Sequence, residues 1–100
     1  MAVIGVLTLE LRLENSHSLK DKRNVVQSLK NRLRHKFNVS VAEIDGQDLW
    51  QRARLTAALT SGSPAMLAAA ADNVERWLAA RFPDGVSIER IVLSVEDLIA

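Results

Sequence analysis

The chain of 100 residues has no cysteine, four glycines, two prolines and four aromatic side chains. Without cysteine, disulfide frameworks, cysteine-based zinc sites, iron–sulfur clusters and thiol catalysis are excluded. Four glycines are too few to build a glycine-rich phosphate loop, and the sequence has no Walker, dinucleotide-binding, GxSxG or HExxH motif. It also lacks an apolar run of about 18 residues and the features of a signal peptide. We therefore expect one soluble, cytoplasmic domain over residues 1–100, without membrane association.

Aliphatic residues dominate the chain, with 14 Leu, 13 Ala, 10 Val and 5 Ile. Alternation of apolar and polar residues predicts strands over 7–13, 53–59 and 86–95, and a β-rich stretch predicts another over 38–45. Apolar residues at helical spacing follow Ser18 and Ser63, which we expect to be N-caps, with Pro64 in the first helical position. The two helices are expected to end near Asn38 and Phe82.

The resulting order is β-α-β-β-α-β. It predicts an α+β fold, a ferredoxin-like two-layer sandwich in which a four-stranded antiparallel sheet carries two helices on one face. Another two-layer α+β domain is the alternative. In the ferredoxin-like arrangement the second face of the sheet is uncovered, so its side chains are candidates for binding.

The cations are concentrated in the first helix. Residues 18–37 hold seven Lys or Arg and one Asp, whereas the rest of the chain holds six basic and eleven acidic residues. At 100° per residue, four cations share one flank of the helix: Lys20, Arg23, Lys30 and Arg34. Lys22 points nearly inward, and we expect its amine to extend out to water. Such a flank suits a phosphate backbone or an acidic protein, and the alternative is a solvated helix face.

The uncovered sheet face is the second candidate surface. Its centre is expected to show Ile4, Val6, Ala58 and Val92. Its rim is expected to hold Glu10, Arg12, Arg52, Arg54 and Arg90, and also Glu89 if that side chain faces the same way. An apolar centre with a polar rim is typical of an interface, either between two copies of the chain or with RNA. The central strands carry no aromatic residue for base stacking, which favours a homodimer through Ile4, Val6, Arg52, Arg54 and Val92. A small exposed patch without consequence is the third possibility.

An acidic cluster precedes the third strand. Glu43, Asp45 and Asp48 lie close in sequence to Trp50. The carboxylates suit a hard cation, or they form an acidic hairpin tip that keeps an edge strand soluble. We favour the tip, and we expect no metal site, no cofactor and no catalytic residue. Trp50 is expected either to pack over the end of the sheet or to anchor a partner.

Three segments of the chain, 16–23, 37–43 and 47–53, resemble the YlxP-like family, a set of small bacterial proteins classed as a domain of unknown function. The resemblance implies a ferredoxin-like fold and a bacterial cytoplasmic protein whose gene often lies near those for translation initiation and ribosome maturation. It supplies no catalytic residues, because no activity is established for the family. The matching positions are Ser18, Leu19, Lys20, Lys22, Arg23, Asn38, Glu43, Asp48, Trp50 and Gln51.

The ferredoxin-like topology places the start of the first helix and the hairpin before the third strand at the same end of the sheet. Lys20, Lys22, Arg23, Glu43, Asp48 and Trp50 are therefore expected to be neighbours. A simpler interpretation is that Glu43 or Asp48 pairs with Lys22 or Arg23 to hold the loop, an interaction of about 0–1 kcal/mol if exposed.

We expect a non-enzymatic protein that associates with RNA or ribosomal particles. The expected contact residues are Lys20, Lys22, Arg23, Lys30, Arg34 and Trp50. The alternative is a homodimeric module that binds a protein or small ligand through the uncovered sheet face. An enzyme is a third hypothesis, and it requires a carboxylate of perturbed pKa in a pocket.

Overall fold

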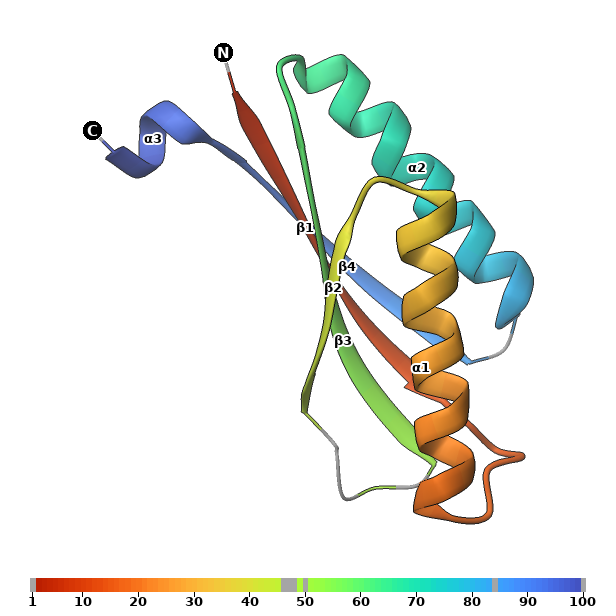
Figure 1. Cartoon of the computed structure of the whole chain (residues 1–100). Coiled ribbons are helices and arrows are strands. Elements are labelled where there is room, and N and C mark those ends of the chain that lie inside the picture. Colours follow the sequence, from red (N-terminus) through yellow and green to blue (C-terminus); the bar gives the residue numbers. More distant parts are fainter. Residues whose placement is uncertain (1, 46–48, 50, 84, 100) are drawn as a thin grey trace.

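The computed structural model describes residues 2–45, 49, 51–83 and 85–99 (Figure 1). The elements in chain order are β1 (Val3–Arg12), α1 (Leu19–Lys36), β2 (Ser40–Asp45), β3 (Arg52–Ser61), α2 (Pro64–Arg81), β4 (Val86–Ser94) and α3 (Val95–Ile99). The strands form one antiparallel sheet in the order β2-β3-β1-β4. The predicted βαββαβ fold is confirmed, and the short helix α3 was not expected. Among the described residues, no helix has both the length and the hydropathy needed to cross a bilayer.

Helices α1 and α2 lie on the same side of the sheet (Figure 1). Because side chains alternate along a strand, Leu7, Leu9 and Leu11 of β1 are buried beneath the helices. Buried residues of the neighbouring strand and of both helices complete the core, among them Val26, Leu29, Leu33, Leu55, Ala57, Leu67 and Leu78. The intervening β1 residues point to the other side, which we call the open face.

Both helices begin where the sequence predicts. The Ser18 hydroxyl accepts a hydrogen bond from the Asp21 backbone N–H at 3.0 Å, and the Asp21 carboxylate accepts one from the His17 backbone N–H at 3.2 Å. Ser63 caps α2 by accepting from the Met66 N–H at 3.3 Å. These hydroxyls satisfy donors that have no partner within the first turn of a helix. Helix α1 ends at Lys36, slightly before the expected Asn38.

Strand β4 corrects the predicted open face. Val92 pairs with Gly5 and Arg90 pairs with Leu7, so both lie on the helix side of the sheet rather than on the open face. Ile91, opposite Val6, and Leu93, opposite Ile4, occupy the open face instead. Ile91 is 53% exposed and Val92 is 49% exposed. Apolar, partly exposed side chains lie on both faces of this edge strand. The alternation of hydrophobicity therefore could not indicate which face the helices cover.

Arg90 links β4 to α2 instead of lining the open face. Its guanidinium donates to Asp72 Oδ1 at 2.6 Å and, through Nε, to Glu75 Oε2 at 2.7 Å. The hydrogen bonds to Asp72 and Glu75 raise the pKa of Arg90 above its ordinary value. The cation is therefore engaged by carboxylates of its own chain, and it is not available to the rim of an interface.

Replacing the cap of α1 tests how this helix begins. Ser18→Ala removes the acceptor of the Asp21 N–H and is expected to lower the free energy of unfolding by about 1 kcal/mol. Ser28→Ala is the matched control, since Ser28 lies exposed in the middle of α1, where alanine is the better helix former. Urea denaturation measures both variants. Equal effects of the two changes would contradict the assignment of Ser18 as the cap.

Candidate functional site

The loop after β1 and the start of β3 meet at one end of the sheet, which we call the loop end. The Leu13 N–H donates to the Gln51 carbonyl at 2.8 Å, and the Gln51 side-chain amide donates to the Ser16 carbonyl at 3.5 Å. Helix α1 also begins at this end (Figure 1). The predicted proximity of these segments is therefore confirmed. Two of the predicted neighbours, Asp48 and Trp50, lie outside the described residues.

Lys22 forms an ion pair with Glu43 beneath the surface. The Lys22 side chain is 1% exposed, and its Nζ lies 2.9 Å from Glu43 Oε2, whose side chain is 20% exposed. Apart from this ion pair, the Glu43 oxygen has no hydrogen-bond partner among the described residues, so the Lys22 ammonium balances its charge. The predicted Lys22–Glu43 pair is confirmed, but the expectation that the Lys22 amine reaches water is wrong. Glu43 lies opposite Leu55 on the helix side, where it meets the inward-pointing lysine.

The outer flank of α1 carries the remaining predicted cations: Lys20, Arg23, Lys30 and Arg34, here called the α1 ridge. Lys20 and Arg23 are exposed and Lys30 is half-buried. The described part of the chain offers no carboxylate in ion-pair contact with these three. Arg34 differs, because its Nη2 donates to the Val41 carbonyl at 2.8 Å on the edge strand β2. The ridge therefore holds three cations available to an anion and a fourth that is partly engaged.

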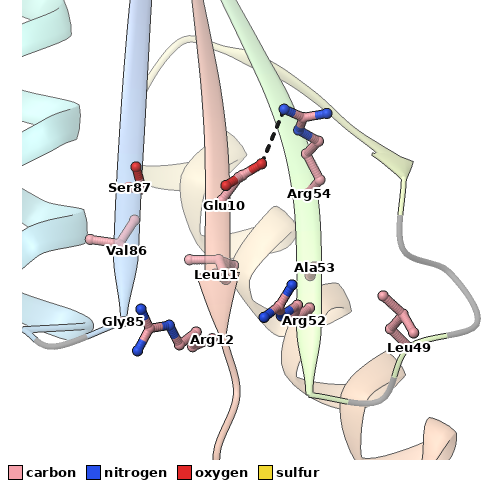
Figure 2. Close-up of a pocket in the computed structure, with 10 residues that line it drawn as sticks. All are labelled: Glu10, Leu11, Arg12, Leu49, Arg52, Ala53, Arg54, Gly85, Val86 and Ser87. Carbon is pink, nitrogen blue, oxygen red and sulfur yellow. Dashed lines mark ion pairs between the residues drawn. The ribbon is translucent and has the colours of Figure 1, made fainter.

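A second group of cations lies on the open face at the loop end. Arg12 of β1 pairs directly with Arg52 of β3, and in the next row Glu10 pairs with Arg54. Figure 2 shows these four side chains together across the ends of the two strands. Arg54 Nη2 lies 3.0 Å from Glu10 Oε1, whereas neither Arg12 nor Arg52 has a carboxylate partner among the described residues. A pocket of about 480 Å³ occupies this corner, and we call it the arginine pocket.

The opposite end of the open face is apolar. Ile4 and Val6 of β1 lie beside their β4 partners Leu93 and Ile91, and Ala58 of β3 lies beside Val6. Between this apolar end and the arginines are two paired threonines, Thr8 and Thr56. Polarity thus changes along the strands of the open face, from aliphatic near the chain's first residues to cationic at the loop end.

Two of the described aromatic residues, Phe37 and Trp77, meet on the helix side of the sheet. Phe37 and Trp77 meet edge to face with ring centroids 6.0 Å apart, and the Arg81 guanidinium lies over the Trp77 ring at 5.4 Å. Sequence reasoning placed Phe37 in the apolar stripe but missed this cluster, because it depends on how the two helices lie beside each other. Within the described residues, no group of three His, Cys, Asp or Glu side chains is arranged to hold a metal.

These features define a class of protein: a small ferredoxin-like α+β domain with a row of cations along its first helix and two arginines paired on the open face of its sheet. Over residues 4–92 the chain matches the family described as "Protein of unknown function (DUF503)", and it belongs to this family. It is 41% identical over 61 residues to the "Uncharacterized protein YlxP" of Bacillus subtilis (strain 168). That match covers 61% of this chain and 66% of the relative. The resemblance to the YlxP-like family is thereby confirmed.

Removing one member of the buried ion pair tests its role in joining α1 to β2. Lys22→Ala leaves the Glu43 carboxylate uncompensated and is expected to lower the free energy of unfolding by about 3 kcal/mol. This is the low end of the range for buried pairs, because Glu43 keeps some contact with water. The double variant Lys22→Met/Glu43→Leu is expected to recover most of the loss, since neither charge of this pair then remains. Urea denaturation compares them, and a double variant as unstable as the single one would refute the pair's role.

Proposed function

We propose that this protein is a non-enzymatic, cytoplasmic RNA-binding protein that contacts RNA, free or within ribosomal particles, through the α1 ridge. The observation that carries the proposal is the set of cations Lys20, Arg23 and Lys30, which have no ion partner among the described residues. Lys20 and Arg23 also lie near the helix N-terminus, where a cation costs about 0.3–1 kcal/mol at low salt. Helix stability therefore does not account for their presence.

The dimensions of the ridge suit an extended polyanion. Lys20 and Arg34 are fourteen residues apart in one helix, which corresponds to about 21 Å along its axis. A line of cations of that length supports contact with several successive backbone phosphates, whereas a single acidic side chain would engage only one of them. The net charge of +1 supports local binding by this flank over non-specific coating of nucleic acid.

Three of the residues predicted to contact RNA are not among the main contacts of this proposal. Lys22 is not part of the proposed surface, because it is buried against Glu43. Arg34 contributes less than the other members of the α1 ridge, since it is bonded to the Val41 carbonyl. Trp50 lies outside the described residues, so its contact with a partner stays a prediction.

Charge reversal on opposite flanks of α1 tests the proposed RNA contact. Lys20→Glu/Arg23→Glu is expected to weaken binding to ribosomal particles at least about tenfold. The slope of log binding constant against log salt concentration should become shallower by about 0.7–0.9 for each phosphate that the variant no longer neutralises. Arg32→Glu/Lys36→Glu is the matched control, because it changes the net charge equally at exposed positions on the other flank of the same helix. Co-sedimentation across a salt series measures both.

If the two double variants lose binding equally, net charge rather than the α1 ridge controls association. If neither loses binding, the ridge does not contact RNA. Lys20→Glu/Arg23→Glu is expected to fold normally, since acidic residues near a helix N-terminus are favourable.

A homodimer formed through the open face is the second candidate, and the second copy of the chain is its proposed occupant. The supporting observation is the apolar end of this face, where Ile4, Val6, Ile91 and Leu93 lie side by side and keep part of their surface exposed. Aliphatic side chains grouped in this way favour burial against another surface. Among homo-oligomers, dimers with a twofold symmetric interface are the commonest.

Adjacent residues on the two faces of β4 test this dimer. Ile91→Asp places a charge on the open face and is expected to convert a dimer to a monomer. Val92→Asp is the control, because Val92 is similarly exposed but lies on the helix side. Sedimentation velocity at micromolar concentration measures the mass. A monomeric wild-type protein, or dissociation by Val92→Asp alone, would exclude the open-face dimer.

A further inference from the structure

The arginine pocket has the features of an anion site that is separate from the α1 ridge. We propose that Arg12 and Arg52 bind the diphosphate group of a small molecule such as a nucleoside diphosphate. This goes beyond the proposed RNA contact, since it uses another surface, other residues and another class of ligand.

The first support is the register of β1 and β3. Arg12 and Arg52 are directly opposite each other, and residues so paired have Cβ atoms about 4.5–5.5 Å apart. Like charges in this position destabilise a sheet, and no described carboxylate relieves the repulsion by pairing with either guanidinium. An anion bound between them would turn that repulsion into two attractions.

The second support is the balance of charge around the pair. Glu10 lies two residues from Arg12 on the same face of β1, and its carboxylate is paired with Arg54 at 3.0 Å. The four charged side chains that line the pocket therefore carry a net charge of +2. Ser87, opposite Glu10 on β4, adds a hydroxyl to the same lining. This combination matches a compact ligand with at least two negative charges.

The third support is the rigidity of the backbone that carries Arg12. The Arg12 N–H donates to the Gly85 carbonyl at 2.8 Å, and the next residue, Leu13, is bonded to Gln51. A Cβ on residue 85 would lie 3.0 Å from the Arg12 carbonyl oxygen, so glycine permits the close approach of the two chains. Both guanidiniums thus project from strand ends that are already positioned, which lowers the cost of ordering a site.

The fourth support is the fit between the pocket and a small molecule. Its volume of about 480 Å³ lies within the usual range of roughly 300–1,000 Å³ for small-molecule sites. Guanidinium groups bind phosphate oxygens through two parallel hydrogen bonds. Two guanidiniums that project from directly paired positions therefore match the two linked phosphates of a diphosphate better than the separated single charges of a phosphodiester backbone. The exposed Leu49 at the rim offers an apolar contact to the rest of the ligand.

Calorimetric titration of the full chain with inorganic pyrophosphate and with ADP, at low ionic strength, tests the proposal. Arg12→Gln and Arg52→Gln are each expected to weaken binding at least about tenfold, because each removes charge-assisted hydrogen bonds. Arg76→Gln is the matched control, since Arg76 lies exposed on α2 and bonds Asn73, and it should bind like the wild type.

Thermal unfolding without ligand separates binding from folding. Arg52→Gln is expected to have a melting temperature equal to or above that of the wild type, since it removes a like-charge pair. Pyrophosphate should raise the melting temperature of the wild type and not that of Arg52→Gln. If Arg52→Gln melts at a lower temperature than the wild type and also loses binding, its lost binding is attributed to misfolding. The titration and melting curve of Arg12→Gln then decide whether the arginine pocket binds pyrophosphate.

Two further arms identify the source of the phosphates and keep this proposal separate from the RNA contact. Lys20→Glu/Arg23→Glu should bind pyrophosphate like the wild type, whatever its effect on RNA. A short oligoribonucleotide without terminal phosphates should not displace ADP. The proposal is overturned if the wild type binds neither pyrophosphate nor ADP, if Arg12→Gln and Arg52→Gln bind them unchanged, or if the oligoribonucleotide competes as strongly as pyrophosphate.

Discussion

The pairing of β1 with β3 on one side and β4 on the other is the constraint on which the rest of the structure depends. It extends from Val3 to the loop end and sets which side of the sheet every neighbouring residue faces. Leucines at alternate positions of β1 are thereby buried beneath α1 and α2, and the hydrophobic effect favours this one-sided coverage. The same alternation places the intervening residues of β1, apolar at one end and charged at the other, on the open face, so the core and the open face have a single cause.

The cations of this chain fall into two groups, those engaged within the fold and those left for other molecules. Lys22 balances Glu43, Arg34 bonds an edge carbonyl and Arg90 is held by Asp72 and Glu75. These contacts join a helix to a strand at both edges of the sheet. Lys20, Arg23 and Lys30 on α1, and Arg12 and Arg52 on the open face, lack such partners among the described residues. Figure 2 shows Arg12 and Arg52 at the loop end, where α1 also begins (Figure 1). The proposals rest on this second group.

Sequence reasoning succeeded where local signals were strong. Two serines at capping positions and leucines at helical or alternate spacing were enough to predict α1, α2 and β1, and with them the fold. It misassigned the faces of β4, because an edge strand that the helices cover only in part can be apolar on both sides. The inward direction of Lys22 and its pairing with Glu43 were expected, but its full burial was not, because that depends on how α1 packs on β2. Likewise, Arg12 and Arg52 were each expected on the open face, but their direct opposition required the register.

The central claim is that the β1–β3 register places the side chains of residues 12 and 52 together on the open face. Disulfide trapping between the two strands tests this claim most directly. The natural chain has no cysteine, so Arg12→Cys/Arg52→Cys introduces the only two thiols. We predict that mild oxidation joins them within one molecule, since directly paired strand residues approach within the distance that a disulfide spans. Arg12→Cys/Ala53→Cys should stay reduced, because Ala53 is buried on the helix side. Thiol alkylation followed by mass measurement distinguishes the two states, and a disulfide in the 12/53 variant together with free thiols in the 12/52 variant would contradict the register.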